Sequence, residues 1–330
     1  MQGINQQSFG TRLALPVLLL GFTAPVTSVF GADAYPAKPV RLIIPFSTGA
    51  AVDVVGRIIA TKLTDRLGKP MVVENRGGAG GIIGPAIAAK AAPDGYTFLA
   101  IGAGYATAPA LYKNLPYDPI KAFIPISKLA NGPSLLVVNA GLPVHSVKEF
   151  IAMAKDKPGQ LLMTSSGAGS YQHLTAELFK LKAGINVTIL QFTGGGAMMA
   201  DLVGGHSHGT LSTGSIVLPH VRSGRLRALG VGSLRRSAIL PDIPTIAETL
   251  PGFESGGWWG MLAPAGVPKP IIDRISKEIQ VIVASDDLKK IFANEASEPD
   301  YLPPAAFGPF LSGQIAQWIK VVKEANIKLE

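Results

Sequence analysis

The chain contains no cysteine among its 330 residues, so disulfide bonds and thiolate metal sites are excluded. Aromatic residues make up only 7%, and none interleave with the scattered basic residues as a platform for stacking nucleic-acid bases requires. We therefore expect no nucleic-acid partner. The formal net charge of +8 favours small anionic ligands, or simply solubility.

Long apolar runs are scarce, and the one at the amino terminus is short. Residues 1–34 combine a single basic residue, Arg12, with an apolar core from Leu13 to Leu20 and a small-x-small motif that ends at Ala34, which together predict a secretory signal peptide. Pro16 interrupts the core, which falls short of the roughly 20 apolar residues that a membrane span needs. Because no cysteine lies near the cleavage point for a lipid anchor, the sequence predicts a free periplasmic protein.

Cofactor motifs are also missing. The glycines of Asn75–Gly81 do not take the first, third and sixth places of the dinucleotide fingerprint, and no phosphate-loop lysine follows them. His206 and His208 form a lone pair without the further ligands that complete a metal site. We expect no cofactor and no metal, and the length and apolar content suit two α/β domains.

A strand, a loop and a helix follow one another between Val40 and Leu67, with Pro45 closing the strand and Gly68 ending the helix. The nearly continuous apolar strand is typical of a buried parallel sheet. A loop of this type presents unpaired N–H groups and the positive end of a helix dipole, which suits an anion. The ligand candidates here are Ser47, Thr48, Gly49, Ala51 and Asp53. Asp53 has the alternative role of a first-turn acid that stabilises only its helix.

The same pattern returns where the predicted strand Leu161–Thr164 runs into a loop rich in serine and glycine. Two such loops on facing domains are suited to closing on a polar ligand. The candidates in this second loop and its helix are Ser165, Ser166, Gly167, Ser170 and His173. Further candidates follow other predicted strands: Tyr105, Thr107, Phe192, Gly194, Ala197 and Ser212.

Gly205–Gly209 matches the G-x-S-x-G motif, which would make Ser207 the nucleophile of a serine hydrolase. That motif requires a strand before it and a helix after it, whereas here a helix precedes and a strand-like segment follows. The hydrolase is therefore a minor alternative.

The remaining elements are predicted from periodicity and turn residues. Expected strands cover 71–74, 97–101, 124–129, 135–139, 187–192, 226–231 and a segment ending at 263. A helix is expected over 82–92, another begins at Ser146 with a capping box to Glu149, and two helices end the chain.

Several short motifs occur in an order that resembles the Bug family, the periplasmic solute-binding proteins of tripartite tricarboxylate transporters. They are Tyr35–Pro39, Val72–Arg76, Ala91–Tyr96, Leu115–Pro119, Ser165–Gly169, Leu240–Thr245 and Leu262–Gly266. The resemblance implies a type II periplasmic-binding-protein fold, in which two α/β domains hold a ligand cleft between them. The implied domains are 35–133 with 253–330, and 134–252.

The resemblance also implies a function without catalysis: capture of an organic carboxylate for integral membrane permease subunits, by a protein we expect to be monomeric. In the family the first and fifth strand-to-helix loops hold a carboxylate, here Ser47–Asp53 and Ser165–Ser170. This chain departs from the family by having Ser47–Asp53 where relatives usually read Pro-Gly-Gly-x-x-Asp, and Phe192–Gly194 in place of Tyr-Lys-Gly. A ligand sensor that signals to a membrane partner is the alternative.

Six large side chains on or beside the candidate loops bear on the ligand's identity. They are Tyr105, Tyr171, Phe192, Met198, Trp258 and Trp259. If two or more line the cleft, an aromatic acid such as terephthalate is an option beside C4 to C6 aliphatic diacids. If they pack in the core, this argument for an aromatic ligand fails.

Overall fold

The computed structural model describes residues 35–237, 239–294, 297–324 and 327, so the predicted signal peptide at 1–34 lies outside the described residues. Within the described part of the chain, no helix is long and apolar enough to cross a membrane.

The strands form one curled sheet in the order β2-β1-β3-β9-β4-β7-β5-β6, with β8 and β10 both pairing with β4. The strands are β1 Val40–Ile44, β2 Met71–Asn75, β3 Thr97–Gly102, β4 Phe123–Asn139, β5 Leu162–Ser165, β6 Thr188–Gln191, β7 Gly209–Thr213, β8 Leu226–Val231, β9 Gly256–Pro264 and β10 Glu298–Leu302. The α-helices are α1 Ala51–Leu67, α2 Ile83–Ala89, α3 Ala103–Leu111, α4 Val147–Asp156, α5 Tyr171–Ala183, α6 Gly195–Val203, α7 Gly214–Arg222, α8 Lys269–Ala284, α9 Asp286–Asn294 and α10 Pro304–Glu324.

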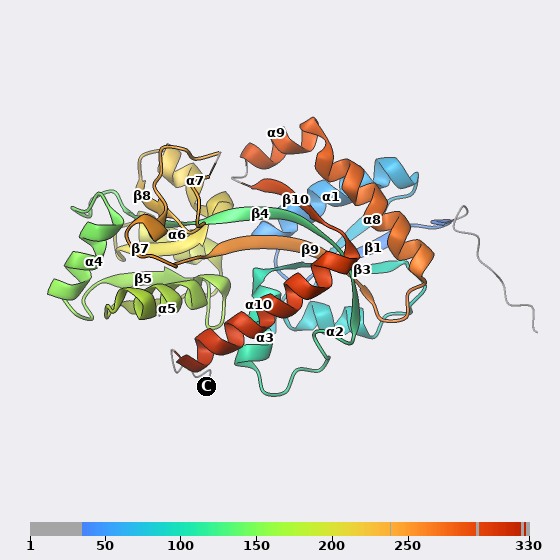
Figure 1. Ribbon diagram of the computed structural model, residues 1–330, viewed down its shortest axis with the longest axis horizontal. Helices are drawn as coiled ribbons and strands as arrows, with labels where there is room; N and C mark the ends of the chain where they lie inside the picture. The colour runs from blue at the N-terminus through green and yellow to red at the C-terminus, as the bar shows by residue number, and fades with distance from the viewer. Residues whose placement is uncertain (1–34, 238, 295–296, 325–326, 328–330) are drawn as a thin grey trace, which may run out of the picture.

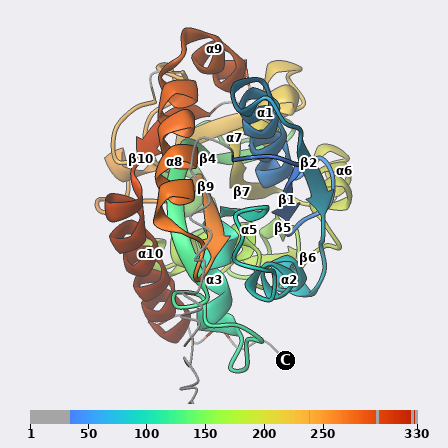
Figure 2. The same cartoon turned by 90° about the vertical axis from the view of Figure 1, so that its right-hand side faces the viewer.

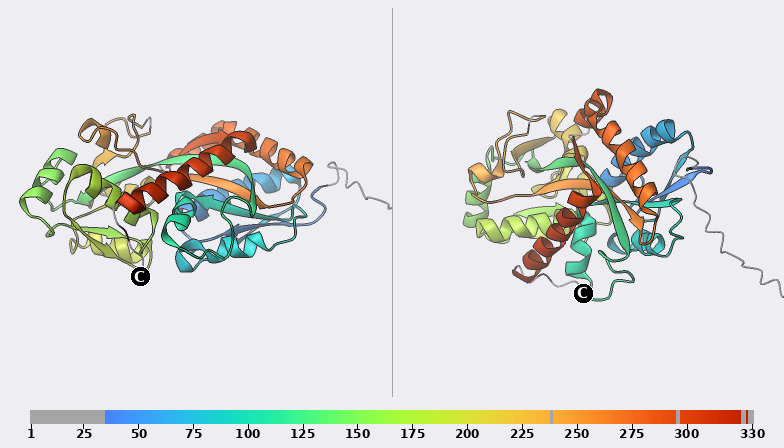
Figure 3. Two further views of the ribbon diagram at one scale, coloured as in Figure 1. Left: turned by 60° about the horizontal axis from the view of Figure 1, so that its bottom comes forward. Right: turned by 45° about the vertical axis from the view of Figure 1, so that its right-hand side comes forward.

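Strand β4 runs through both halves of the molecule. Its residues up to Pro133 pair antiparallel with β9, and those from Ser134 to Asn139 pair with β7 and β8. Figures 1 and 3 show β4 and β9 side by side between the two halves of the molecule. We call the half with β1, β2, β3 and β10 the first lobe, and the half with β5 to β8 the second lobe. The prediction of two separate strands at 124–129 and 135–139 was wrong, because β4 is continuous over 17 residues.

Each lobe places the ends of its parallel strands at one edge. In the first lobe β1 lies between β2 and β3, and in the second β5 lies between β6 and β7, all parallel. The carboxyl ends of parallel strands meet at a common edge, where ligands of open α/β sheets bind. Gly68 ends α1 in the left-handed conformation with φ 68°, as predicted.

The carboxyl-terminal part differs from the prediction of two helices. It holds the three helices α8, α9 and α10 and the strand β10, whose residues are all half-buried and include Glu298, Pro299 and Asp300. Such a polar strand lacks the apolar alternation that periodicity detects. Helices α8 and α10 pack along β4 (Figures 1 and 2), so the end of the chain braces the crossing strands.

Three smaller differences concern helices. The helix expected over 82–92 is limited to Ile83–Ala89, and α7 was not predicted. Ser146 caps α4 by accepting a hydrogen bond from the Glu149 N–H at 3.1 Å, as expected. The Glu149 carboxylate, however, accepts from the N–H of His145 at 2.7 Å, one residue before the predicted capping box.

Candidate ligand-binding site

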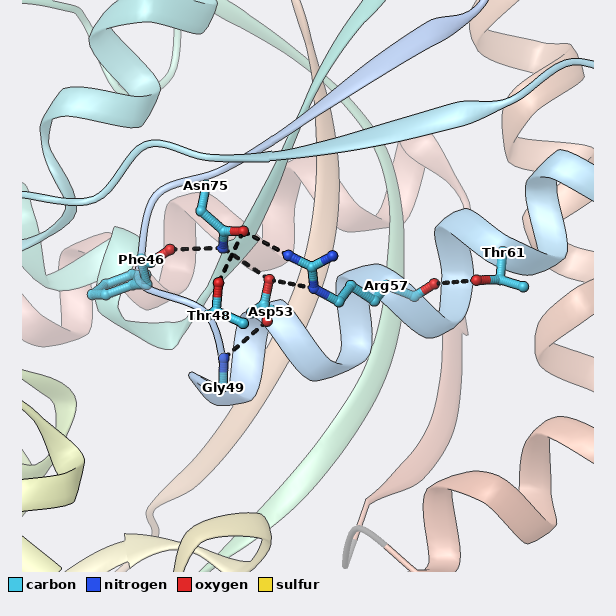
Figure 4. A network of polar contacts seen from close by, with 7 residues as sticks. All are labelled: Phe46, Thr48, Gly49, Asp53, Arg57, Thr61 and Asn75. Carbon is cyan, nitrogen blue, oxygen red and sulfur yellow. Dashed lines mark hydrogen bonds and ion pairs between the residues drawn. The ribbon is translucent and has the colours of Figure 1, made fainter.

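The first-lobe loop is held by a charged network around Asp53 (Figure 4). One carboxylate oxygen accepts from the Gly49 N–H at 2.9 Å. The other accepts from Arg57 Nε at 2.9 Å and from Asn75 Nδ2 at 2.8 Å. Asn75 also donates to the Phe46 carbonyl at 2.9 Å, which ties the end of β2 to the loop after β1.

The hydrogen bonds of this network involve both carboxylate oxygens of Asp53 and lower its pKa. Burial alone would raise the pKa of the Asp53 carboxyl, but the hydrogen bonds from Arg57, Asn75 and Gly49 outweigh it and hold the pKa below its usual value. The side chain is 2% exposed and both of its oxygens accept hydrogen bonds from the protein. Asp53 is therefore a buried residue that holds the loop in place through hydrogen bonds.

The remaining residues of this loop face outward. Ser47, Thr48 and Gly49 are exposed, and Ala51 is half-buried at the start of α1, which has no side-chain cap. The Thr48 hydroxyl reaches Asn75 Oδ1 only at 3.4 Å, a long contact. The hydroxyls of Ser47 and Thr48 are thus presented at the surface of the loop.

The second-lobe loop is held by neutral groups. Ser165 Oγ donates to Gln191 Oε1 at 2.8 Å, and Ser166 Oγ donates to Gln172 Oε1 at 2.9 Å. Gln172 Nε2 in turn reaches Ser212 Oγ at 3.4 Å, which links this loop to the end of β7. Neutral amides and hydroxyls therefore hold this loop, whereas charged side chains hold the loop of the first lobe.

His173 fixes the far end of the same loop. Ser170 caps α5 by accepting from the His173 N–H at 3.2 Å, and His173 Nδ1 accepts from the Gly169 N–H at 3.0 Å. Burial lowers the pKa of His173, Glu177 acts in the opposite direction and Lys180 adds to the lowering. The imidazole is therefore neutral at pH 7 and accepts at Nδ1.

The two lobes touch at this place. Thr107 Oγ1 of the first lobe donates to Gly104 O at 2.8 Å and lies 3.4 Å from Gly169 O of the second lobe. Helices α3 and α5 also contact one another. Helix α3 and the loop after β5 are therefore neighbours, although 62 positions separate Thr107 from Gly169.

A sequence profile described as "Tripartite tricarboxylate transporter family receptor" matches residues 55–327. The chain belongs to this family. Protein BugT of Bordetella pertussis is 36% identical over 323 residues, which cover 97% of this chain and 99% of BugT. The resemblance to the Bug family stated from the motifs is confirmed.

Solved structures of similar receptors confirm the fold class. R. palustris Rpa4515 with adipate has a TM-score of 0.84 at 33% identity, covering 89% of this chain and 99% of that one. The periplasmic binding protein BugD has a TM-score of 0.81 at 33% identity, covering 90% and 100%. MatC from Rhodopseudomonas palustris with bound malate has a TM-score of 0.79 at 28% identity, covering 87% and 100%. The protein has the mixed α/β fold of the periplasmic binding proteins and is a solute-binding receptor of this family.

Several of the predicted large side chains are engaged in packing. The ring of Tyr105 is buried against Tyr117, and its hydroxyl donates to Pro119 O at 2.7 Å. Met198 is fully buried in the second lobe, in a cluster that Phe192 packs against from a half-buried position. The structure therefore gives Tyr105 a packing role.

The two tryptophans also pack in the interior. Trp258 lies edge-on against Phe307 and Phe310, and its Nε1 donates to Gln314 Oε1 at 3.1 Å. Trp259 is 4% exposed and fills the space above Gly132, where a β-carbon would collide with its ring. Both tryptophans therefore pack in the protein interior.

The later strands of the second lobe bring further predicted residues near the second loop. Phe192 N donates to Ser165 O at 3.0 Å, and the Phe192 carbonyl lies close to Gly167. Gly194, with φ 115°, precedes α6, in which Ala197 is exposed.

Ser207 has no geometry for catalysis. It is 1% exposed, and within the described residues its hydroxyl has no hydrogen-bond partner, so no base activates it. The neighbouring His208 accepts from the Leu162 N–H through Nδ1 at 2.9 Å. The G-x-S-x-G match lies in a turn before β7, which is consistent with a binding receptor.

Four polar residues that hold the loops were missed from the sequence: Arg57, Asn75, Gln172 and Gln191. Asn75 and Gln191 end β2 and β6, which flank the strands that carry the two loops. Polar residues at the ends of neighbouring parallel strands are a signal that strand order would have revealed. His and acidic residues form no group of three suited to a metal within the described part of the chain.

Two surface cavities of about 460 and 470 Å³ lie elsewhere on the receptor. The smaller has apolar walls that include Ile124, Val267 and Ile272. The larger lies where β4 and β9 cross and is lined from both lobes, by Lys128 and Trp318 on one side and Arg235 on the other. Neither shares a lining residue with the predicted ligand loops.

Proposed function

We propose that this receptor captures an organic carboxylate in the periplasm and delivers it to the membrane subunits of a tripartite tricarboxylate transporter. The observation that carries the proposal is a hydroxyl- and amide-rich loop at the carboxyl end of a parallel strand in each lobe, the second of which contacts α3 of the first lobe through Gly169 and Thr107. Neutral donors and helix amino termini stabilise an anion by modest amounts each, on the order of 1 kcal/mol.

Two domains that close on the ligand form part of the proposal. The change of partners along β4 at Pro133 and Ser134 supports domains 35–133 with 253–330, and 134–252. The ligand contacts would come from Ser47, Thr48, Gly49 and Ala51 in the first domain and from Ser166, Gly167, Ser170 and the loop around Gly194 in the second. Asp53, Ser165, His173 and Ser212 would hold these contacts in place.

An aliphatic dicarboxylate is the first ligand class that we propose. Similar receptors were solved with adipate and with malate, which are both dicarboxylates. The large side chains that would favour an aromatic acid are mostly occupied by packing, since Tyr105, Met198, Trp258 and Trp259 are all buried. Phe192 is half-buried beside the second loop and is the remaining argument for an aromatic body.

A thermal-shift screen followed by titration calorimetry tests this function. The panel contains adipate, malate, citrate, benzoate, phthalate and terephthalate, with amino acids and sugars as controls. A ligand present at 100 times its Kd should stabilise the receptor by about 2.7 kcal/mol. Recovery of the ligand unchanged supports binding without turnover, whereas stabilisation by amino acids or sugars alone would overturn the proposal.

A further inference from the structure

Phe46 lies between the end of β1 and the exposed Ser47 of the first-lobe loop, and it is half-buried. Its carbonyl accepts the hydrogen bond from Asn75 at 2.9 Å, which fixes its backbone. Its ring points away from the network around Asp53 (Figure 4) and packs against the core of the first lobe. Phe46 is thus an apolar residue at the carboxyl edge of the sheet, with part of its surface accessible.

Glycines of the two neighbouring segments lie against this ring. A β-carbon at Gly81, in the segment after β2, would come within 2.8 Å of Phe46 Cζ and collide with the ring. A β-carbon at Gly104, in the first turn of α3 after β3, would lie 3.7 Å from the same atom. The ring therefore lies where the carboxyl ends of β1, β2 and β3 come together, which is the edge where ligands of open α/β sheets bind.

This position adjoins the contact with the second lobe. The Gly104 carbonyl accepts from the Thr107 hydroxyl at 2.8 Å, and the same hydroxyl lies 3.4 Å from Gly169 O. Gly169 belongs to the loop after β5, directly before Ser170. The contacts from Phe46 through Gly104 and Thr107 thus connect the first of the two proposed ligand loops to the second.

We propose that Phe46 determines ligand specificity: its ring lies against the carbons between the two carboxylates and selects dicarboxylates without hydroxyl groups on those carbons. The inference rests on the proposed function, in which the loops hold the carboxylates. A methylene gains apolar contact with the ring. A hydroxyl placed there gives up its hydrogen bonds to water without an equivalent partner, so hydroxylated diacids are disfavoured.

Two matched pairs of diacids test this preference by titration calorimetry on the mature protein. Succinate and malate share a C4 chain and differ by one hydroxyl, and adipate and D-glucarate share a C6 chain and differ by four. We expect the member without hydroxyls to bind at least fivefold more tightly in each pair. Because the two members have the same length and charge, the contribution of the carboxylates cancels in the ratio.

Three variants show whether Phe46 is the source of the preference. Phe46→Ala should reduce the affinity ratio at least threefold in both pairs, because water can enter the vacated space and bond to the hydroxyls of the ligand. Phe46→Leu keeps an apolar side chain and should retain the ratio within twofold. Phe310→Ala is the control, since Phe310 is also half-buried but packs against Trp258 in α10, and it should leave the ratio unchanged.

The outcomes separate this inference from the proposed function. Equal affinities within the pairs, an unchanged ratio in a folded Phe46→Ala, or an equal loss in Phe310→Ala would overturn the inference. The ratio in the parent protein tests it even if Phe46→Ala does not fold. Tighter binding of malate and D-glucarate, or binding of another carboxylate and none of these four, would leave carboxylate capture standing and refute the role of Phe46. If no carboxylate binds, the proposed function fails and this inference fails with it.

Discussion

The two loops that we propose for ligand binding both follow a parallel strand of their lobe but are held by different chemistry. In the first lobe a buried carboxylate, Asp53, gathers an arginine, an amide and a backbone N–H. In the second lobe Gln172 and His173 bind serine hydroxyls and a backbone N–H without any formal charge. An ion network thus holds the loop of one lobe and neutral hydrogen bonds hold the loop of the other, so the two loops should lose stability under different conditions.

We expect the largest loss of stability when Asp53, the carboxylate that accepts the hydrogen bonds of the ion network, is removed. Asp53→Ala removes three hydrogen bonds and leaves the buried end of the network without its acceptor, so we expect the free energy of unfolding to fall by about 3 kcal/mol. Asp53→Asn should cost about half as much. The amide oxygen still accepts a hydrogen bond, but the amide NH2 group faces the N–H donors of the site and cannot accept from them. Urea unfolding measures both.

The control for Asp53 is Asp118, an exposed carboxylate that accepts the N–H groups of Ile120 and Lys121 at 2.9 and 2.8 Å. Asp118→Asn should cost less than about 1 kcal/mol, since water replaces what is lost. If Asp53→Asn is as stable as the parent protein, the network does not hold the loop.

The second prediction uses pH to separate the lobes. Burial lowers the pKa of His173, so the folded state favours the neutral imidazole and loses stability as the pH falls below about 6.5, the ordinary pKa of histidine. Asp53, whose pKa is also lowered, contributes stability that is present above its ordinary pKa of about 4 and is lost at lower pH. The second loop should therefore weaken first on acidification.

Unfolding measured between pH 8 and pH 5 checks this order. His173→Asn keeps an acceptor near the position of Nδ1 and should cost about 1 kcal/mol at pH 8 while flattening the decline of stability below pH 6.5. The pKa of His220 is also lowered, by burial and by Arg225, so His220→Asn is the matched control and should flatten the decline less. An unchanged slope in His173→Asn would contradict the assignment of the neutral histidine.

The two loops themselves could be predicted from the sequence, but the residues that hold them could not. The β1–α1 and β5–α5 loops were predicted because a buried strand, a small-residue loop and an amphipathic helix are local patterns. The groups that hold them, such as Asn75 and Gln191, come from flanking strands whose neighbours depend on strand order, which no local pattern contains. The ligand roles of the predicted residues stay a prediction.

The continuity of β4 was missed for a related reason. The predicted strands left a gap between 129 and 135, yet Asn131, Gly132 and Pro133 of this gap lie within the strand. Gly132 is required there because the Trp259 ring occupies the space of its β-carbon, so tertiary packing, and not turn geometry, explains the glycine. A turn signal and a close-packing signal look the same in sequence.

The third prediction addresses the contact between α3 and the second loop. Thr107→Val removes the hydroxyl that donates to Gly104 O and lies near Gly169 O, at similar volume, and should lower the free energy of unfolding by about 1 kcal/mol. Thr61→Val is the control, because Thr61 donates to Arg57 O at 3.0 Å on the exposed side of α1. Thr61→Val should cost less than half as much in the same urea titration.

The smallest effect on stability, and the sharpest test of the comparison, is expected at Thr48. Its hydroxyl is exposed and makes only the 3.4 Å contact with Asn75, whereas Ser166 donates to Gln172 at 2.9 Å. Thr48→Ala should therefore change the free energy of unfolding by less than about 0.5 kcal/mol while weakening the binding of adipate or malate, whichever stabilises the receptor more, by about fivefold. Ser166→Ala should cost about 1 kcal/mol of stability, because it leaves Gln172 without its donor. Calorimetry beside urea unfolding distinguishes the two, and a Thr48→Ala variant with unchanged affinity would remove the exposed hydroxyl of the first loop from the ligand contacts.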